Sequence, residues 1–193
     1  MGYVQEHYAK DADGDVSISN ESAMLLPVDS SSVMRRDTVA NSWSRPDGSV
    51  INASEYSIEN GVMSSDFSLA YADDAWQVEG QLQGKPVKTT LAHTDWLLSG
   101  FGSYVELKNL RQSESESGQF NMWAPSADPT SALPVVLKKL SDNENANFQI
   151  DMGPQVMAFL ADEKAIFRKG TIAQGPVELK LELIYSKGEP SLQ

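Results

Sequence analysis

The chain contains no cysteine, and this absence excludes several kinds of chemistry at once. Disulfide bonds, thiolate nucleophiles, cysteine-ligated zinc and iron–sulfur clusters all require a sulfur that the chain does not supply. Histidine is also scarce: His7 and His93 are the only two. One chain therefore cannot form a three-histidine metal site, and we expect neither a metal ion nor a cofactor.

Long apolar runs are missing as well. No stretch approaches the roughly 18 apolar residues that a membrane-spanning helix needs, so we expect no integral membrane segment. The residues from Tyr3 to Asp15 are too polar for the hydrophobic region of a signal peptide. Met1 and Gly2 are compatible with the start of a trimmed mature chain, from which a signal or anchor has been removed.

Basic residues are fewer than acidic residues, and this imbalance limits the kinds of partner that the chain is expected to bind. The 15 lysines and arginines face 27 aspartates and glutamates, which gives a formal net charge of −12. An acidic protein repels phosphate backbones, so we do not expect nucleic acid as a partner.

At 193 residues the chain has the length of one domain with a single core. We expect one domain over residues 1–193, with an irregular N-terminal region at 1–48 and a sheet core at 49–193.

The clearest pattern is a series of alternating segments separated by turn residues. In residues 62–71 the odd positions carry most of the large apolar side chains, and in residues 76–82 the even positions do. Alternation of this kind predicts strands with one buried face. Asn60-Gly61 suits a tight hairpin, because both central residues of a type I′ turn need positive φ. Short connections join antiparallel neighbours, so we predict that 62–71 pairs with both 49–59 and 76–82.

Other segments extend this pattern. Alternation predicts further strands at 119–124, 147–152 and 177–185, whereas the N-terminal region offers only short candidates at 3–8, 16–19 and 33–43. One short helix is expected from Ser103, where Ser-x-x-Glu has the form of a capping box. A second is expected from Pro154 to about Glu163. The predicted fold class is mainly β: an antiparallel meander forming a curved sheet, a half-barrel or a small barrel, with one or two short helices packed on it.

Asp11, Asp13 and Asp15 around Gly14 suggest a calcium loop, since hard cations bind several carboxylate oxygens near one tight turn. The acidic residues required at the first and last positions of an EF-hand loop are missing, however. This favours an Asp-Gly surface turn, and we predict no calcium binding tighter than roughly millimolar.

His93, Asp95 and Ser99 lie close together and suggest a hydrolase. A nucleophilic serine usually occupies a recognisable turn, and the Gly-x-Ser-x-Gly elbow is absent here. An N-cap at Thr94 or Asp95 explains the same residues without catalysis. We therefore expect no catalytic residues and no enzyme activity.

The apolar faces of the two central strands are the best candidate for a binding surface. Cross-strand neighbours on one face lie about 5 Å apart, so these side chains are expected to form one continuous apolar surface. Trp123 lies on the face of its predicted strand that is opposite to the other apolar side chains. It is therefore the best single candidate for contact with a ligand. Core packing explains the same methionines and aromatics, and both interpretations stay open. The predicted ligand-binding residues are Met63, Phe67, Leu69, Trp76, Val78 and Trp123.

By shape alone, the predicted sheet resembles the curved half-barrels and small barrels of bacterial envelope proteins, although fold does not imply function. The first hypothesis is a non-enzymatic envelope protein, periplasmic or otherwise exported, whose concave sheet face holds a lipid-like or glycolipid-like amphiphile. A cytoplasmic location remains an alternative, and the oligomeric state is left open.

Two other functions are carried as alternatives. One is a carbohydrate-binding or adhesive β-module that uses exposed aromatics from among Trp43, Trp76, Trp96 and Trp123. The other is a carboxylate-dependent hydrolase, which would show two convergent carboxylates in a cleft, one with a raised pKa.

Overall fold

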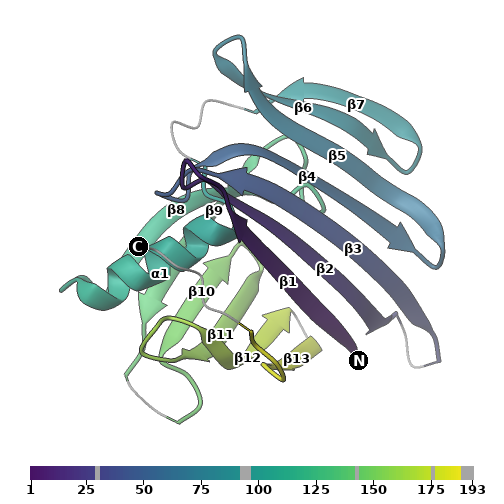
Figure 1. The fold of residues 1–193 in the computed structure, drawn as a ribbon. Helices are drawn as coiled ribbons and strands as arrows, with labels where there is room; N and C mark the ends of the chain where they lie inside the picture. Colours follow the sequence, from purple (N-terminus) through teal and green to yellow (C-terminus); the bar gives the residue numbers. More distant parts are fainter. Residues whose placement is uncertain (29–30, 92–96, 142–143, 175–176, 188–193) are drawn as a thin grey trace.

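The computed structural model describes residues 1–28, 31–91, 97–141, 144–174 and 177–187. Two antiparallel sheets and one helix make up the fold of these residues (Figure 1). This confirms the predicted fold class.

Each sheet is built from strands in chain order. The seven strands of sheet A are β1 (Gly2–Lys10), β2 (Val16–Pro27), β3 (Val33–Ser44), β4 (Val50–Glu59), β5 (Val62–Ala72), β6 (Ala75–Leu82) and β7 (Lys85–Thr90). The helix α1 (Gly100–Gln112) follows, and sheet B then contains β8 (Ser117–Trp123), β9 (Ala132–Lys139), β10 (Phe148–Met152), β11 (Gln155–Ala161), β12 (Phe167–Gln174) and β13 (Val177–Glu182).

The predicted central meander is confirmed. β5 pairs antiparallel with both β4 and β6. Asn60 and Gly61 connect β4 to β5 with φ angles of 50° and 83°, as a tight hairpin turn requires. The strands expected at the start of sheet B and near its end are also present, as β8, β10 and β13.

The prediction of an irregular N-terminal region is wrong. β2 and β3 pair along their whole length, from Val16 opposite Ser44 to Pro27 opposite Val33. These strands are rich in serine, asparagine and threonine on both faces, so they lack the apolar alternation that marks a half-buried strand. Pro27 occupies the last position of β2, where a missing backbone donor does little harm to the ladder.

The first predicted helix is present but begins earlier than expected. Its N-cap is Ser99, whose Oγ accepts a hydrogen bond from the Gly102 backbone N–H at 3.2 Å. Ser103 therefore lies inside the first turn, and the capping box predicted with Glu106 is wrong.

The second predicted helix is also wrong, because Gln155–Ala161 forms strand β11. Gly153 has a φ of 58° and turns the chain between β10 and β11. Both faces of β11 carry apolar residues, for example Val156 on one face and Phe159 on the other. These two residues are three positions apart, which is also the spacing of apolar residues along one face of a helix.

Two of the three core clusters contain residues of α1. Leu107 and Leu110 of the helix pack in one cluster with residues of sheet B, and Phe101 packs with Val16 and Ile18 of β2. In Figure 1 the helix accordingly crosses one face of sheet B. Just before the helix, Leu98 forms β-bridges to Ser49 and to Met122, so this short segment connects the two sheets.

Sheet A has two distinct faces. Ile18, Leu69 and Val78 are buried on one of them, which we call the inner face, and their chain neighbours point to the outer face.

No helix within the described ranges is long and apolar enough to span a bilayer.

Candidate binding site

Five of the six predicted ligand-binding residues come together in the structure. Phe67 and Val78, with exposed fractions of 1% and 0%, belong to one core cluster with Leu69. Trp76 and Trp123 are partly buried and pack against the same cluster. The three fully buried side chains offer no exposed surface to a ligand in this conformation, and the binding role of the set stays a prediction.

Met63 does not join this cluster. Ser57 pairs with Ser65 and Ile58 with Met63, so Ser64 is an additional residue in β5. A bulge of this kind interrupts the alternation of side chains along a strand. Met63 is consequently 41% exposed, although it shares the odd parity of Phe67.

Trp123 is held by its own loop. Its indole Nε1–H donates to the Pro129 carbonyl oxygen at 3.2 Å. The loop of residues 124–131 connects β8 to β9, and Ala132 at its far end packs on the same core cluster as Trp123. The tryptophan therefore helps to fix this loop against the inner face of sheet A.

The outer face of sheet A contains a hollow of about 550 Å³, lined by residues of the five adjacent strands β1 to β5. Register brings its lining together from distant parts of the sequence. One cross-strand row consists of Ser17, Trp43, Asn52 and Ala70, and the next row on the same face consists of His7, Ser19, Asn41, Ser54 and Ser68. Sequence reasoning missed this site, because the positions of its members follow from strand register rather than from a local motif.

The chemistry of the hollow is uncharged. None of its described lining residues is Asp, Glu, Lys or Arg, in a chain with 27 acidic and 15 basic residues. Hydroxyl and amide side chains, which both donate and accept hydrogen bonds, surround Trp43, and the tryptophan is 43% exposed. His7 shares a 2.7 Å hydrogen bond with Gln5 at the β1 side of the hollow.

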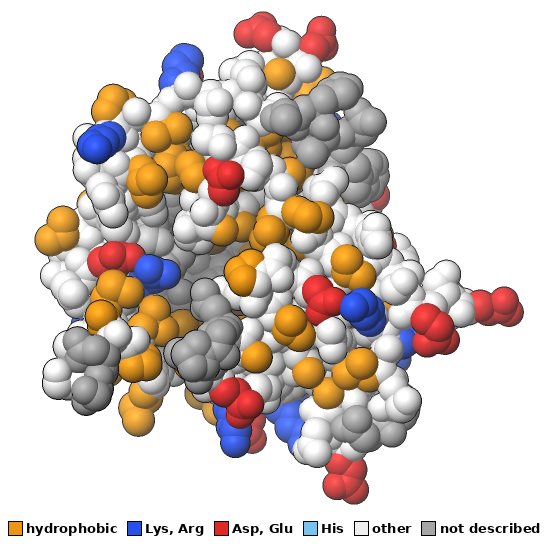
Figure 2. All heavy atoms as spheres, turned by 180° about the vertical axis from the view of Figure 1, so that it is seen from behind, with side chains coloured by type: hydrophobic (Ala, Val, Ile, Leu, Met, Phe, Trp, Pro, Cys, Tyr) orange, Lys and Arg blue, Asp and Glu red, His pale blue; other side chains and the backbone are white. Residues whose placement is uncertain are grey.

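On the face shown in Figure 2, hydrophobic side chains lie in small groups separated by polar and charged ones. This face therefore does not suggest one broad apolar binding surface.

Glu55 is a partly buried titratable group on the inner face of sheet A. It lies between Ala40 and Phe67 in the cross-strand row, and its Oε1 is buried without a hydrogen-bond partner among the described residues. Burial raises the pKa of Glu55, and hydrogen bonds from the Ser126 hydroxyl and backbone N–H oppose this effect only in part. Glu59, four residues further along β4, is paired with Arg36 at 2.6 Å. Among the described residues, the groups that shift the pKa of Glu55 include no second carboxylate of the kind that the hydrolase alternative requires.

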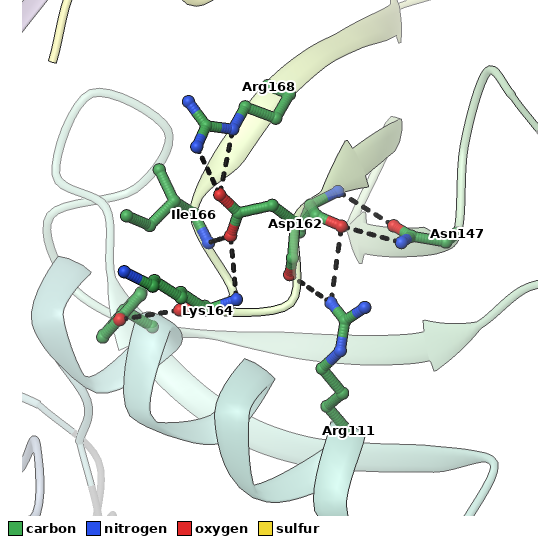
Figure 3. Close-up of polar contacts among 8 residues, drawn as sticks. Arg111, Asn147, Asp162, Lys164, Ile166 and Arg168 are labelled. Atoms are coloured by element: carbon green, nitrogen blue, oxygen red, sulfur yellow. Dashed lines mark hydrogen bonds and ion pairs between the residues drawn. The ribbon is translucent and has the colours of Figure 1, made fainter.

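A polar cluster around Asp162 stabilises the turn between β11 and β12 (Figure 3). Asp162 Oδ1 accepts hydrogen bonds from the backbone N–H groups of Lys164 and Ile166 at 2.9 Å each, and Oδ2 accepts from Arg168 Nε at 3.0 Å. Burial disfavours ionisation of Asp162, but the hydrogen bonds of Ile166, Arg168 and Lys164 prevail and lower its pKa. Every feature of this carboxylate is explained by the turn.

Hydrogen bonds from Arg111 and Asn147 connect the same turn to neighbouring elements. Arg111 of α1 donates to the backbone oxygens of Ala161 and Asp162, and the buried Asn147 makes two hydrogen bonds with the Ala161 backbone, at 2.8 and 2.9 Å (Figure 3). These bonds satisfy backbone groups at the end of β11 and connect the helix to sheet B. Their role is structural.

The other polar candidates also have local partners. Asp11 Oδ1 accepts hydrogen bonds from the backbone N–H groups of Asp13 and Asp15 at 3.0 Å each, which forms a surface turn. Ser99 caps α1 and accepts a hydrogen bond from Ser44 Oγ at 2.5 Å. His93 and Asp95, its proposed partners in catalysis, lie outside the described residues, as does Trp96. The described part of the chain contains no group of three or more His, Cys, Asp or Glu arranged to hold a metal ion.

No family model and no curated protein matches this sequence. Among solved structures, the fold is similar to a β-barrel-like protein of the domain of unknown function DUF1849 from Brucella abortus, with a TM-score of 0.70 and 11% identity, over 95% of this chain and 86% of that one. A DUF1089 family protein from Pseudomonas aeruginosa aligns with a TM-score of 0.46 and 14% identity, over 85% of this chain and 86% of that one. The first likeness shows a shared β-barrel-like fold, and the second carries no further argument.

Proposed function

We propose that this chain is a non-enzymatic binding protein of the bacterial cell envelope. Its ligand is a glycolipid-like amphiphile whose uncharged sugar head group lies in the outer hollow of sheet A. The observation that carries this proposal is the exposed ring of Trp43 within an uncharged hollow lined by hydroxyl and amide groups. A β-barrel-like fold is consistent with a binding role.

The residue types around Trp43 match the chemistry of a sugar. A pyranose ring has an apolar face of C–H groups that packs on an aromatic ring, and a rim of hydroxyls that both donate and accept hydrogen bonds. Asn41, Asn52 and Ser54 supply groups of the same dual character in the hollow. A neutral head group needs no ion pair, which agrees with the absence of charged side chains from the described lining.

The size of the hollow limits how much of the ligand it holds. Its volume of about 550 Å³ lies within the range of small-molecule sites. Such a space holds a sugar head group rather than a complete lipid, so the acyl chains would extend beyond the hollow. The part of the ligand that decides specificity is therefore the head group.

Titration calorimetry with two amphiphiles tests the head-group preference. The probes are an alkyl glucoside and an alkyl sulfate of equal chain length, each used below its micelle concentration. We expect the glucoside to bind and the sulfate to bind at least tenfold more weakly. Trp43→Ala should weaken glucoside binding at least tenfold, and Trp43→Phe should retain part of it. The matched control is Tyr56→Ala, which removes an exposed aromatic on the same face but outside the hollow and should bind as the wild type does.

Equal binding of both amphiphiles, or full binding by Trp43→Ala, would contradict the proposal. Mass spectrometry of the glucoside after prolonged incubation tests the non-enzymatic part, since the ligand should be recovered unchanged. Fractionation of the source cells tests the location, and the chain is expected with the periplasm or the membranes.

A further inference from the structure

Strand β1 leaves one of its two sides open along its whole length. Among the described residues it hydrogen-bonds only to β2 and forms one border of sheet A (Figure 1). Its nine residues pair with β2 without a bulge, and they extend over roughly 30 Å. Each of them is exposed. An edge of this kind is a template for pairing with another strand.

The other three borders of the two sheets are protected against such pairing. β7 has only six residues and starts with Lys85 and Pro86, and the proline lacks a backbone donor. Alternate residues of β13 are charged, from Glu178 to Glu182. The border at β8 is partly covered, because the Leu98 N–H donates to the Asn121 carbonyl oxygen at 2.8 Å. β1 has neither proline nor alternate charges, and no described strand covers its open side.

The charged side chain in the middle of β1 is engaged within its own sheet. Glu6 Oε2 accepts a hydrogen bond from the Tyr8 hydroxyl at 2.9 Å, and Oε1 accepts one from Asn20 Nδ2 at 2.8 Å. Tyr3 and Val4, which precede it, are 57% and 46% exposed. The edge therefore combines open backbone with exposed apolar side chains.

The hydrogen bonds between β1 and β2 show which backbone groups point outward. The Leu25 N–H donates to the Met1 oxygen at 2.8 Å, and the Asp11 N–H donates to the Asp15 oxygen at 3.0 Å. Hydrogen-bonded and non-hydrogen-bonded pairs alternate along antiparallel strands, so the odd-numbered residues of β1 bond to β2. The backbone groups of the even-numbered residues point to the open side; these include Gly2, Val4, Glu6 and Tyr8.

We propose that a second copy of this chain pairs antiparallel with the open edge of β1, about a two-fold axis at Gln5. Such an edge is self-complementary, since the outward N–H and C=O groups of one copy meet those of the other. The two copies of sheet A then form one continuous sheet. Because the axis is perpendicular to this sheet, the hollows of both copies open on the same side of it. The pairing does not depend on the ligand of the hollow.

The side chains of β1 favour Gln5 as the centre of the pairing. In a two-fold antiparallel pair the central residue lies opposite its own copy. A centre at Glu6 sets two carboxylates opposite each other, which is unfavourable. A centre at His7 leaves the exposed Tyr3 beyond the end of the partner strand. A centre at Gln5 sets two amides opposite each other, which both donate and accept hydrogen bonds, and it places Tyr3 opposite the partner's His7.

Single cysteines test this register, because the chain has no cysteine of its own. Gln5 bonds to β2, so in the dimer it belongs to a non-hydrogen-bonded pair with a Cα–Cα distance of about 4.5 Å, which a disulfide can bridge. Under mild oxidation Gln5→Cys should form a covalent dimer at least about tenfold faster than Glu6→Cys or His7→Cys. Lys88→Cys, exposed on the opposite border of sheet A, is the matched control for random collision. Fastest cross-linking at a position other than Gln5, or rates no higher than that of Lys88→Cys, would overturn the proposal.

Val4→Pro tests the contribution of the backbone. The Val4 N–H points to the open side, so proline removes a donor from the dimer contact and leaves the β1–β2 ladder intact. By analytical ultracentrifugation the wild type should dimerise at micromolar concentrations, and Val4→Pro should raise the Kd of the dimer at least about tenfold. Val4→Thr keeps the N–H and is the matched control, with an unchanged Kd; circular dichroism checks that both variants fold. A wild type that stays monomeric, or an unchanged Kd in folded Val4→Pro, would overturn the proposal. The cysteine test needs no proline and decides the question if Val4→Pro does not fold.

Discussion

Replacement of Phe67 by alanine tests directly whether the inner face of β5 is closed core. The side chain is 1% exposed and lies between Glu55 of β4 and Gly80 of β6 in the cross-strand row. A Cβ added at Gly80 would lie 2.8 Å from the Phe67 ring. The ring therefore occupies the space that the glycine leaves.

The magnitude follows from this burial. Truncation of a fully buried phenylalanine leaves a cavity and lowers the free energy of unfolding by about 3–5 kcal/mol. For a chain of this length that loss corresponds to a fall in Tm of roughly 6–20 °C. Met63→Ala in the same strand should cost only about 1 kcal/mol, because the bulge at Ser64 leaves Met63 41% exposed.

Urea unfolding followed by far-ultraviolet circular dichroism measures both variants against the wild type, with comparison of the m-values. Equal costs for Phe67→Ala and Met63→Ala would refute the closed core. So would a cost for Phe67→Ala well under half of the expected value, accompanied by weaker binding of an apolar fluorescent dye. That second result would show that Phe67 lines an open pocket.

Three further predictions concern polar groups. Because burial raises the pKa of Glu55, the wild type should lose stability as pH rises above about 4, the ordinary range of a glutamate, and Glu55→Gln should abolish this component of the slope; urea titrations at several pH values check it, and parallel curves would contradict it. Asn147→Ala removes both hydrogen bonds to the Ala161 backbone inside the protein and should cost about 2–4 kcal/mol by calorimetry, whereas a loss below about 0.5 kcal/mol would refute the role assigned to this side chain. Ser99→Ala should lower the free energy of unfolding by about 1 kcal/mol through loss of the N-cap, and an equal or greater effect of Ser103→Ala would show that the cap is misplaced.

The parts of the fold that the sequence predicts are those encoded locally. Asn60 and Gly61 adopt the positive φ angles that their residue types favour, and the strands on either side alternate as their apolar residues indicate. Phe67, Leu69 and Val78 accordingly share one cluster. In each case the residues that predict the turn or strand are the same residues that form it, or lie within a few positions of them.

The hollow lies beyond such reasoning. Ser17, Trp43 and Asn52 come from three different strands and meet only through the register of β2, β3 and β4. Serine-rich and asparagine-rich strands give no apolar alternation, so residues 1–48 look irregular although they supply nine of the fifteen residues that line the hollow. Polar residues on both faces of these strands remove the apolar alternation by which a strand is predicted from its sequence.

The exposure of Met63 has a similar origin. The residues around Ser64 do not predict a β-bulge, because the bulge depends on how β4 and β5 align. Strand β11 illustrates the opposite difficulty. Its two faces are both apolar, and the local pattern then fits a helix as well as a strand.

The order of the strands has a kinetic consequence. Within the described residues, each strand of sheet A and of sheet B hydrogen-bonds only to strands adjacent in the chain. Slow folding of β proteins comes mainly from pairing between remote segments, whose loops must close before any contact forms. Here each hairpin closes over a short connection, so the two meanders can form separately and early. The rate should then depend on the later docking of the two halves around α1 and Leu98, which contact residues of both halves.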